Sequence, residues 1–187
     1  MLMEQSLQNH FLIAMPTLID SFFYRSVIYI CEHNEDGAMG LIINRPTQIM
    51  LDELFAHLEV DNISPISKNT SVLFGGPVQK EQGMIIHDSP HQWVSTKSLD
   101  DELYLTTSTD ILSLVGTPAG PDNFLITLGY AGWETGQLEQ ELVDNSWLTV
   151  PANKDILFKT PADKRWLAAG KLLGVDMNLM TLAMGHA

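Results

Sequence analysis

Two hydrophobic segments joined by a short polar turn, between Arg25 and Pro46, constrain the fold of this chain more than any other feature of its sequence. Side chains alternate at period two along a strand, and residues 26–33 are then largely apolar on both faces. A strand covered on both sides is predicted to lie in the middle of a domain. The turn contains Asp36 and Gly37, a pair that tolerates the backbone angles of tight hairpins, so we expect a β-hairpin here.

The length of the turn leaves two strand registers open. If the turn has four residues (34–37), His33 faces Ala38 and Cys31 faces Gly40. If it has only two, His33 faces Gly40 and Cys31 faces Ile42. We favour the longer turn. In either register Gly40 leaves an open slot beside Cys31 or His33, which could admit a ligand or simply serve close packing.

The second strand of the hairpin ends in two polar residues, Asn44 and Arg45. Pro46 lacks an amide hydrogen and is expected to end the strand pairing. We expect the fold to hold both side chains in place, with Asn44 bridging backbone groups and Arg45 paired with a carboxylate. The alternative is an anion-recognition corner formed together with Thr107 or Ser108, which requires these segments to converge.

Six segments in order carry a family resemblance: HFLIAMP (10–16), YICEH (29–33), GAMGLIINRP (37–46), FGGPV (74–78), LTTSTDIL (105–112) and LGYAGWETGQLEQEL (128–142). With them the chain resembles the YqgE/AlgH family of bacterial proteins over nearly its whole length. The resemblance implies an α+β fold in which a mixed sheet forks and partly closes into a small barrel, surrounded by helices. It implies little about function, since the family is mostly uncharacterised and carries a regulatory label only on its alginate-linked branch.

Charge and composition narrow the possible partners. The chain has 187 residues, of which 45% are hydrophobic, and this length favours a single domain spanning 1–187. A net charge of −13 with ten Lys and Arg residues argues against direct binding to nucleic acids or to anionic membranes. One cysteine, no signal-peptide pattern at the start and no long apolar run together predict a soluble cytoplasmic protein.

Periodicity places the remaining elements. Strands are expected at 11–15, 72–74, 83–87, 93–99, 102–106, 123–128 and 146–150. Helices are expected at 51–58, 107–115, 137–143, 155–158, 160–174 and from Asp176 onward. Residues 18–23 are expected to form a turn or a short helical segment, 129–133 a turn, and 61–70 a surface loop.

Two further segments are candidates for binding. Thr107, Ser108 and Asp110 begin a predicted helix, with Thr107 and Asp110 three residues apart as a capping pair. Plain capping is the favoured interpretation, and anion binding is the alternative. Tyr130 and Trp133 could wall a groove, but such residues are also common at core margins, and we favour that interpretation.

Catalytic and metal-binding readings receive less support. His87 and His91 flank Asp88, but Ser89–Pro90 interrupts the local geometry, so we expect no bound metal and no cofactor. The acidic helix at 137–143 is expected to be a solvated face with Glu139 and Gln140 outward, because a catalytic carboxylate pair needs contrasting environments. Cys31 is expected to be buried and structural.

Three function classes remain. The favoured hypothesis is a regulatory or scaffold protein that binds another protein and is not an enzyme. The second is a small-ligand pocket near the hairpin, and the third is thiol chemistry at Cys31, as a redox sensor or nucleophile. The candidate binding residues for these hypotheses are Cys31, His33, Gly40, Asn44, Arg45, Thr107, Ser108, Tyr130 and Trp133.

Overall fold

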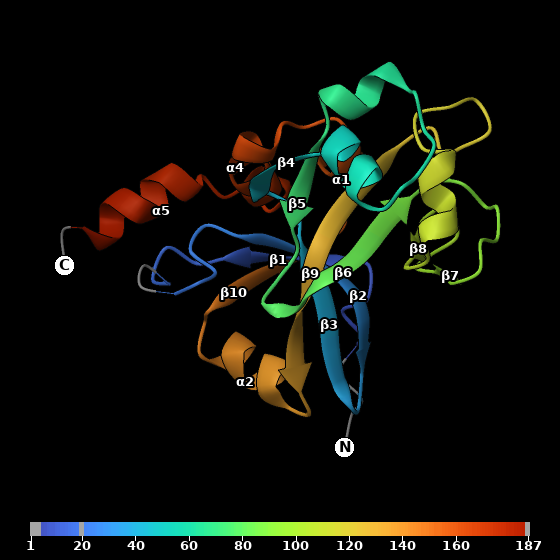
Figure 1. Ribbon diagram of the computed structural model, residues 1–187. Helices are drawn as coiled ribbons and strands as arrows, with labels where there is room; N and C mark the ends of the chain where they lie inside the picture. The colour runs from blue at the N-terminus through green and yellow to red at the C-terminus, as the bar shows by residue number, and fades with distance from the viewer. Residues whose placement is uncertain (1–4, 19–20, 186–187) are drawn as a thin grey trace. The chain divides into compact units, whose positions relative to one another are not determined.

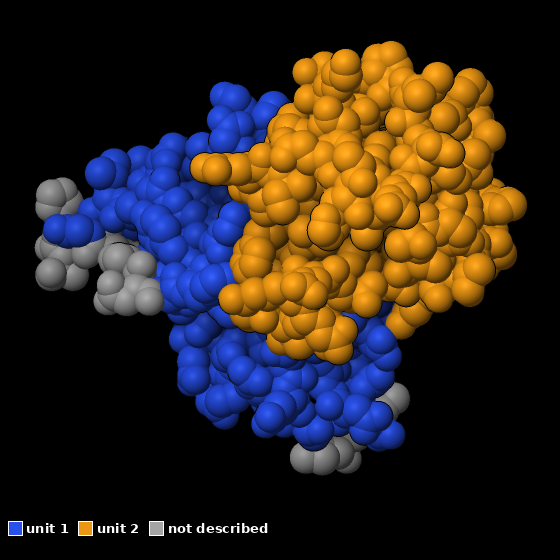
Figure 2. Space-filling view, in the orientation of Figure 1, with its two compact units in different colours: residues 1–45, 131–187 blue, residues 46–130 orange. Residues whose placement is uncertain are grey.

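The structure is a computed structural model that describes residues 5–18 and 21–185. The chain divides into two compact units, shown in Figure 2: unit 1 comprises residues 1–45 and 131–187, and unit 2 comprises 46–130. Both units combine strands and short helices, so the predicted α+β class is confirmed. The turn expected at 18–23 includes Ile19 and Asp20, which lie outside the described residues.

Unit 1 is built on an antiparallel run of strands in the order β10-β1-β2-β3-β9 (Figure 1). Its strands are β1 (His10–Ala14), β2 (Val27–Asn34), β3 (Gly37–Ile42), β10 (Trp147–Pro151) and the last part of β9 (Phe124–Glu134). Its helices are α2 (Gln137–Val143), α3 (Lys154–Phe158), the 3₁₀ helix η3 (Ala162–Lys164), α4 (Arg165–Leu172) and α5 (Met177–Met184). Residues 11–14, 27–31 and 41–43 are fully buried, so the hairpin β2–β3 lies in the core as predicted.

Unit 2 contains a mixed arrangement of strands. Its strands are β4 (Pro46–Met50), β5 (Ser71–Phe74), β6 (Val78–His87), β7 (Thr96–Ser98), β8 (Tyr104–Thr106) and the first part of β9. Its helices are α1 (Leu51–His57) and the 3₁₀ helices η1 (Pro65–Lys68) and η2 (Thr109–Ser113). Strand β5 pairs with β9 in parallel, whereas β4–β5, β9–β6, β6–β8 and β8–β7 are antiparallel. Nine buried residues from α1, β5, β6, η2, β9 and neighbouring loops form its core: Leu51, Phe55, Val72, Ile85, Trp93, Ile111, Leu112, Val115 and Ile126.

Strand β9 belongs to both units and is where the sheet branches. Thr127 and Leu128 pair with β5 and with β6, and residues 131–134 pair with β3. This branching is the fork expected of the sheet. The turn expected at 129–133 is wrong, because β9 continues through it. Gly129 provides a local kink with a φ of 75°, in the left-handed region that glycine tolerates.

Other differences from the predicted elements have local causes. The pairing of β3 with β2 ends before Pro46, as expected, and Pro46 begins a new strand, β4, where the first residue can lack a donor. The helix expected at 160–174 begins with the 3₁₀ turn η3 before α4 starts at Arg165. The strand expected at 93–99 is reduced to β7, and the loop expected at 61–70 contains η1. Among helices of the described residues, none is long and apolar enough to cross a membrane.

We predict that the two units unfold together, in line with the expected single domain. Strand β9 is continuous across the boundary between the units, with its first part paired in unit 2 and its last part in unit 1, so unfolding of either unit frays a strand that the other unit uses. Tryptophan fluorescence can test this, because Trp93 lies in unit 2 and Trp166 in unit 1. In each of two variants whose single tryptophan is Trp93 or Trp166, fluorescence and far-UV circular dichroism should give the same urea midpoint. Two separated midpoints would contradict a single cooperative domain.

Candidate functional site

The predicted site residues of the hairpin sit around a β-bulge. His33 pairs with Ala38, which is the register predicted with the longer turn, but Asn34 pairs with Gly37, so the expected four-residue turn is wrong and only Glu35 and Asp36 lie between the strands. Gly40 pairs with Ile30 rather than with Cys31. The register shifts between Ile30 and Glu32, so Cys31 is the extra residue of the bulge. The expected pairing of Cys31 with Gly40 is therefore wrong, because a bulge interrupts the strict alternation that the expectation assumed.

The slot expected beside Gly40 is filled by neighbouring atoms. A Cβ atom at Gly40 would lie 2.6 Å from Cγ2 of Ile28 and 2.9 Å from the carbonyl oxygen of Tyr29. Gly40 thus permits close strand packing and leaves no room for a ligand there. Cys31 is fully buried, with its Sγ 4.0 Å from the same Tyr29 carbonyl. Solvent does not reach this thiol in the folded protein.

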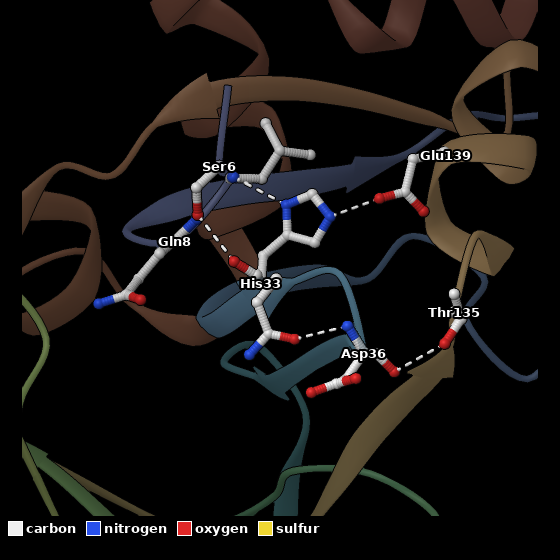
Figure 3. Close-up of polar contacts among 8 residues, drawn as sticks. Ser6, Gln8, His33, Asp36, Thr135 and Glu139 are labelled. Carbon is white, nitrogen blue, oxygen red and sulfur yellow. Dashed lines mark hydrogen bonds and ion pairs between the residues drawn. The ribbon is translucent and has the colours of Figure 1, made fainter. Parts of the chain in front are cut away.

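His33 joins three segments of unit 1, as Figure 3 shows. Its Nδ1 accepts a hydrogen bond from the backbone N–H of Leu7 at 2.9 Å, and its Nε2 lies 2.6 Å from Oε1 of Glu139. Because Nδ1 accepts, Nε2 carries the proton and donates it to the carboxylate. The hydroxyl of Ser6 donates a hydrogen bond to the carbonyl oxygen of His33 at 3.0 Å. His33 therefore ties the N-terminal segment and α2 to the hairpin.

The acidic helix α2 is less solvated than its sequence suggests. Glu139, expected to point outward, accepts the bond from His33. Partial burial alone would raise the pKa of the Glu139 carboxyl, but the hydrogen bond from His33, a backbone hydrogen bond at Glu139 and the charge of His33 together hold the pKa below its ordinary value. Glu141 accepts hydrogen bonds from the indole nitrogens of Trp133 and Trp147, at 2.9 and 2.8 Å. These carboxylates are occupied by structural contacts.

Asn44 closes the open end of the hairpin. Its Oδ1 accepts from the backbone N–H of Val27 at 2.9 Å, and its Nδ2 donates to the carbonyl of Arg25 at 2.9 Å. Arg25 has a φ of 53°, an uncommon value for a residue with a side chain. The amide of Asn44 therefore supports a strained entry into β2, as expected for a residue held by the fold.

Arg45 and Arg165 complete this end of the hairpin. Arg45 donates to the hydroxyl of Ser26 at 3.0 Å and lies over the ring of Phe22. Partial burial lowers the pKa of its guanidinium. No carboxylate of the described residues pairs with it, so the expected ion pair is wrong; the aromatic ring and hydroxyl take its place.

Arg165, which is buried in α4, was not among the predicted site residues. Its guanidinium donates to the carbonyls of Ile43, Ile156 and Thr160, and burial lowers its pKa to about 10. A buried arginine with carbonyl partners satisfies backbone groups that strand pairing leaves open. No local sequence pattern predicts this role of Arg165, because Ile43 lies 122 residues away in the chain.

The aromatic pair predicted near Gly129 is divided between the units. Tyr130 belongs to unit 2 and pairs with Val78 on β6, whereas Trp133 belongs to unit 1. Trp133 is buried, and its indole N–H donates a hydrogen bond to Glu141. This is the position of a tryptophan at a core margin.

Thr107 and Ser108 lie in unit 2, at the start of η2. The predicted capping pair of Thr107 and Asp110 is wrong, because the N-cap is Ser108 and it makes no side-chain cap bond. Instead, Asp110 accepts from the N–H of Val94 at 2.9 Å, and Ser108 accepts from Ser95. The segment folds against the preceding loop, so local capping rules do not describe it.

Unit 2 contains a pocket of about 760 Å³. Its floor is one face of the β6–β9 pair, where Gly83 lies opposite Leu128 and Ile85 opposite Ile126. Its walls come from β4, α1, the bulged start of β6 and the η2 region: Ile49, Glu53, Leu54, His57, Leu58, Lys80, Glu81, Gln82, Thr107, Ser108, Thr109 and Leu112. Of the predicted candidates, Thr107 and Ser108 line it, and the hairpin residues do not.

His87 is buried among aromatic rings. Its Nε2 lies 2.7 Å from the hydroxyl of Thr106, and its Nδ1 accepts from the N–H of Ser89 at 3.3 Å. Burial lowers its pKa to about 4, against smaller opposing effects of Asp88 and Ser89. No cluster of three or more potential metal ligands is present among the residues with described positions.

We predict that Asn44→Ala lowers the free energy of unfolding by about 1–3 kcal/mol, because it leaves the partly buried N–H of Val27 and the exposed carbonyl of Arg25 without their partner. Asn44→Asp keeps the acceptor for Val27 and loses only the donor, so it should cost less. Urea unfolding measures both. Unchanged stability in Asn44→Ala would show that the amide is not structural.

We predict that His87 contributes to acid destabilisation. Its folded pKa of about 4 lies below the ordinary value of 6.5, so the unfolded chain binds more protons between these values. The free energy of unfolding should therefore fall by about 3 kcal/mol from this group as pH drops from 7 to 4. His87→Gln should reduce the loss measured by urea unfolding. Equal losses in both proteins would contradict this assignment.

The comparisons with known proteins agree with one another. The family model described as AlgH-like (DUF179) matches residues 11–178. A UPF0301 protein of Shewanella loihica is 51% identical over 97% of this chain and 99% of its own length. The UPF0301 protein YqgE of Salmonella newport is 47% identical over 97% of this chain and 100% of its own.

Solved structures show the same fold. The solution structure of AlgH from Pseudomonas aeruginosa superposes with a TM-score of 0.79 at 46% identity, over 96% of this chain and 97% of that one. A crystal structure from Corynebacterium diphtheriae gives a TM-score of 0.73 at 19% identity, over 97% and 94% of the two chains, which concerns the fold alone. With a family model covering most of its length and relatives near half identity, the chain belongs to the AlgH-like family, as its sequence segments predicted.

Proposed function

We propose that this protein is a regulatory protein without enzymatic activity, which binds another protein through helix α5. The observation that carries the proposal is the exposed apolar surface of this helix. Leu179 and Leu182 are 63% and 61% exposed, and they lie three residues apart on one face. Exposed apolar surface on a soluble protein is a common mark of an interaction site.

Helix α5 is anchored at its first turn. Met177 is fully buried against Gly170 of α4, where a Cβ atom would lie 2.5 Å from its Cγ. The side chain of Asp176 accepts hydrogen bonds from the N–H groups of Asn178 and Leu179, at 3.0 and 3.3 Å. This anchoring fixes where the helix starts, while its later residues remain available to a partner.

The composition of α5 supports a protein partner. The segment MNLMTLAM contains no charged residue, in a chain with a net charge of −13. An apolar groove on a partner could cover such a helix without removing any charge from water. Methionines adapt their shape to irregular surfaces and are favoured in binding helices of this kind.

The structural contacts of the polar residues around the hairpin support the proposal that the protein is not an enzyme. His33, Asn44 and Glu139 are occupied by contacts that hold backbone or side-chain groups. The complete burial of the Cys31 side chain argues against thiol chemistry there. A small ligand in the unit 2 pocket is a second candidate function, and it concerns other residues than α5 does.

A photo-crosslinking residue placed at position 179 or 182 tests this proposal in bacteria that express the protein. We expect both positions to give the same adduct with one other protein, identified by mass spectrometry. When the probe is at one of these two positions, replacing the leucine at the other position with Glu should remove the adduct, because the carboxylate would have to be desolvated in the interface. The fold should be retained, since both leucines are largely exposed.

A probe at Gln140, an exposed position on α2, controls for random collision and should give no such adduct. An adduct with a second copy of this chain would instead show self-association, and the proposed regulatory partner would be rejected. Absence of any adduct specific to positions 179 and 182 would also contradict the proposal.

A further inference from the structure

The unit 2 pocket exists because one strand position lacks a side chain. Gly83 pairs with Leu128, and the next inward pair on the same face is Ile85 with Ile126. A Cβ atom at Gly83 would have no other atom within 4 Å. Its φ lies outside the left-handed region, so the backbone there would accept any residue. Glycine at this position therefore leaves open space above Leu128.

The floor and nearby walls of this space are apolar. Leu54 and Leu112 add to the surface formed by the β6–β9 pair. Ile49 and Leu58 at the margin are 37% and 41% exposed, which leaves apolar surface in contact with water. The volume of about 760 Å³ falls within the range of pockets that bind small organic molecules. An apolar body would gain from covering these groups.

Hydrogen-bond donors lie around the apolar floor. Lys80 has no ion-pair partner among the residues whose positions are described, nor does His57. The hydroxyls of Thr107 and Thr109 make no hydrogen bond within that same set. Each of these four side chains lines the pocket. They are available to a ligand group that accepts hydrogen bonds.

The acidic residues of the lining are Glu53 and Glu81. Glu53 turns back to the start of α1, where its Oε1 lies 3.5 Å from the N–H of Met50 in a capping box. Gln82 donates its amide to the carbonyl of Thr107 at 3.3 Å, which links the bulged start of β6 to the η2 region. Glu53 and Glu81 are the acidic side chains of the lining, and Lys80 is the lysine that supplies a positive charge for an anionic ligand group.

We propose that this pocket binds a small amphipathic carboxylate, with an apolar chain on the β6–β9 floor and the carboxylate held by Lys80 and the threonine hydroxyls. The site is independent of α5 and of the proposed partner binding. Lysine suits an anionic group that has one charged end. Removal of the apolar chain from water would supply much of the affinity.

Decanoate, decanol and decylammonium test the proposal, because they share one chain length and differ in the head group. Titration of isotope-labelled protein, followed by amide NMR shifts, should show decanoate binding tightest, with shifts centred on Gly83, Ile85, Ile126 and Leu128. Decanol binding as tightly as decanoate, or decylammonium binding more tightly, would overturn the assigned head group.

Substitutions at Gly83 test the location. Gly83→Ala and Gly83→Leu should reduce decanoate binding in that order, because the added side chain occupies the open space. Neither should lower the thermal midpoint, since the backbone is compatible and no atom clashes. Unchanged affinity in a folded Gly83→Leu variant would place the binding elsewhere and overturn the proposal.

Substitution of Lys80 tests the charge. Lys80→Met should weaken decanoate binding by about tenfold and leave decanol binding unchanged. Lys68→Met is the matched control, because Lys68 is an exposed lysine of the same unit that does not line the pocket. Equal losses in both lysine variants would show a general charge effect and reject the role of Lys80.

Discussion

Strand β9 provides backbone hydrogen bonds to β3, β5 and β6, and the strands of both units depend on it. Buried N–H and C=O groups need hydrogen-bond partners, so the backbone conformation of a strand that pairs with three others is tightly constrained. Gly129 makes this course possible. A Cβ atom there would lie 2.3 Å from the carbonyl oxygen of Gly76, which excludes every residue with a side chain. Glycine is therefore required at this position of β9.

Polar residues near the hairpin satisfy groups that the strands leave open. Asn44 binds backbone at the start of β2, and Arg165 reaches the carbonyl of Ile43 just after β3. His33 binds the N–H of Leu7 and the carboxylate of Glu139. Each unsatisfied buried group costs about 1–3 kcal/mol, so such residues are explained by stability alone. A polar residue on a central strand is therefore weak evidence for chemistry in this fold.

Elements set by local sequence could be predicted, and those set by distant contacts could not. The hairpin, α1, α2 and the capped start of α5 follow from periodicity and turn residues. The bulge at Cys31 and the kink at Gly129 depend on neighbouring strands, which periodicity does not reveal. The pair of His33 and Glu139 spans 106 residues. Without the strand pairing, a sequence cannot show that these side chains meet.

The candidate site was only partly predictable for the same reason. Thr107 and Ser108 were noted as a helix start, and they line the pocket because of how η2 lies beside β6. Gly83 carried a usable signal, since glycine inside a strand weakens it and often marks a close approach or a binding surface. A larger residue there would cover the half-buried Leu128 and add strand propensity. The chain instead keeps apolar surface open to water in unit 2, and burial of that surface by a ligand would offset its cost.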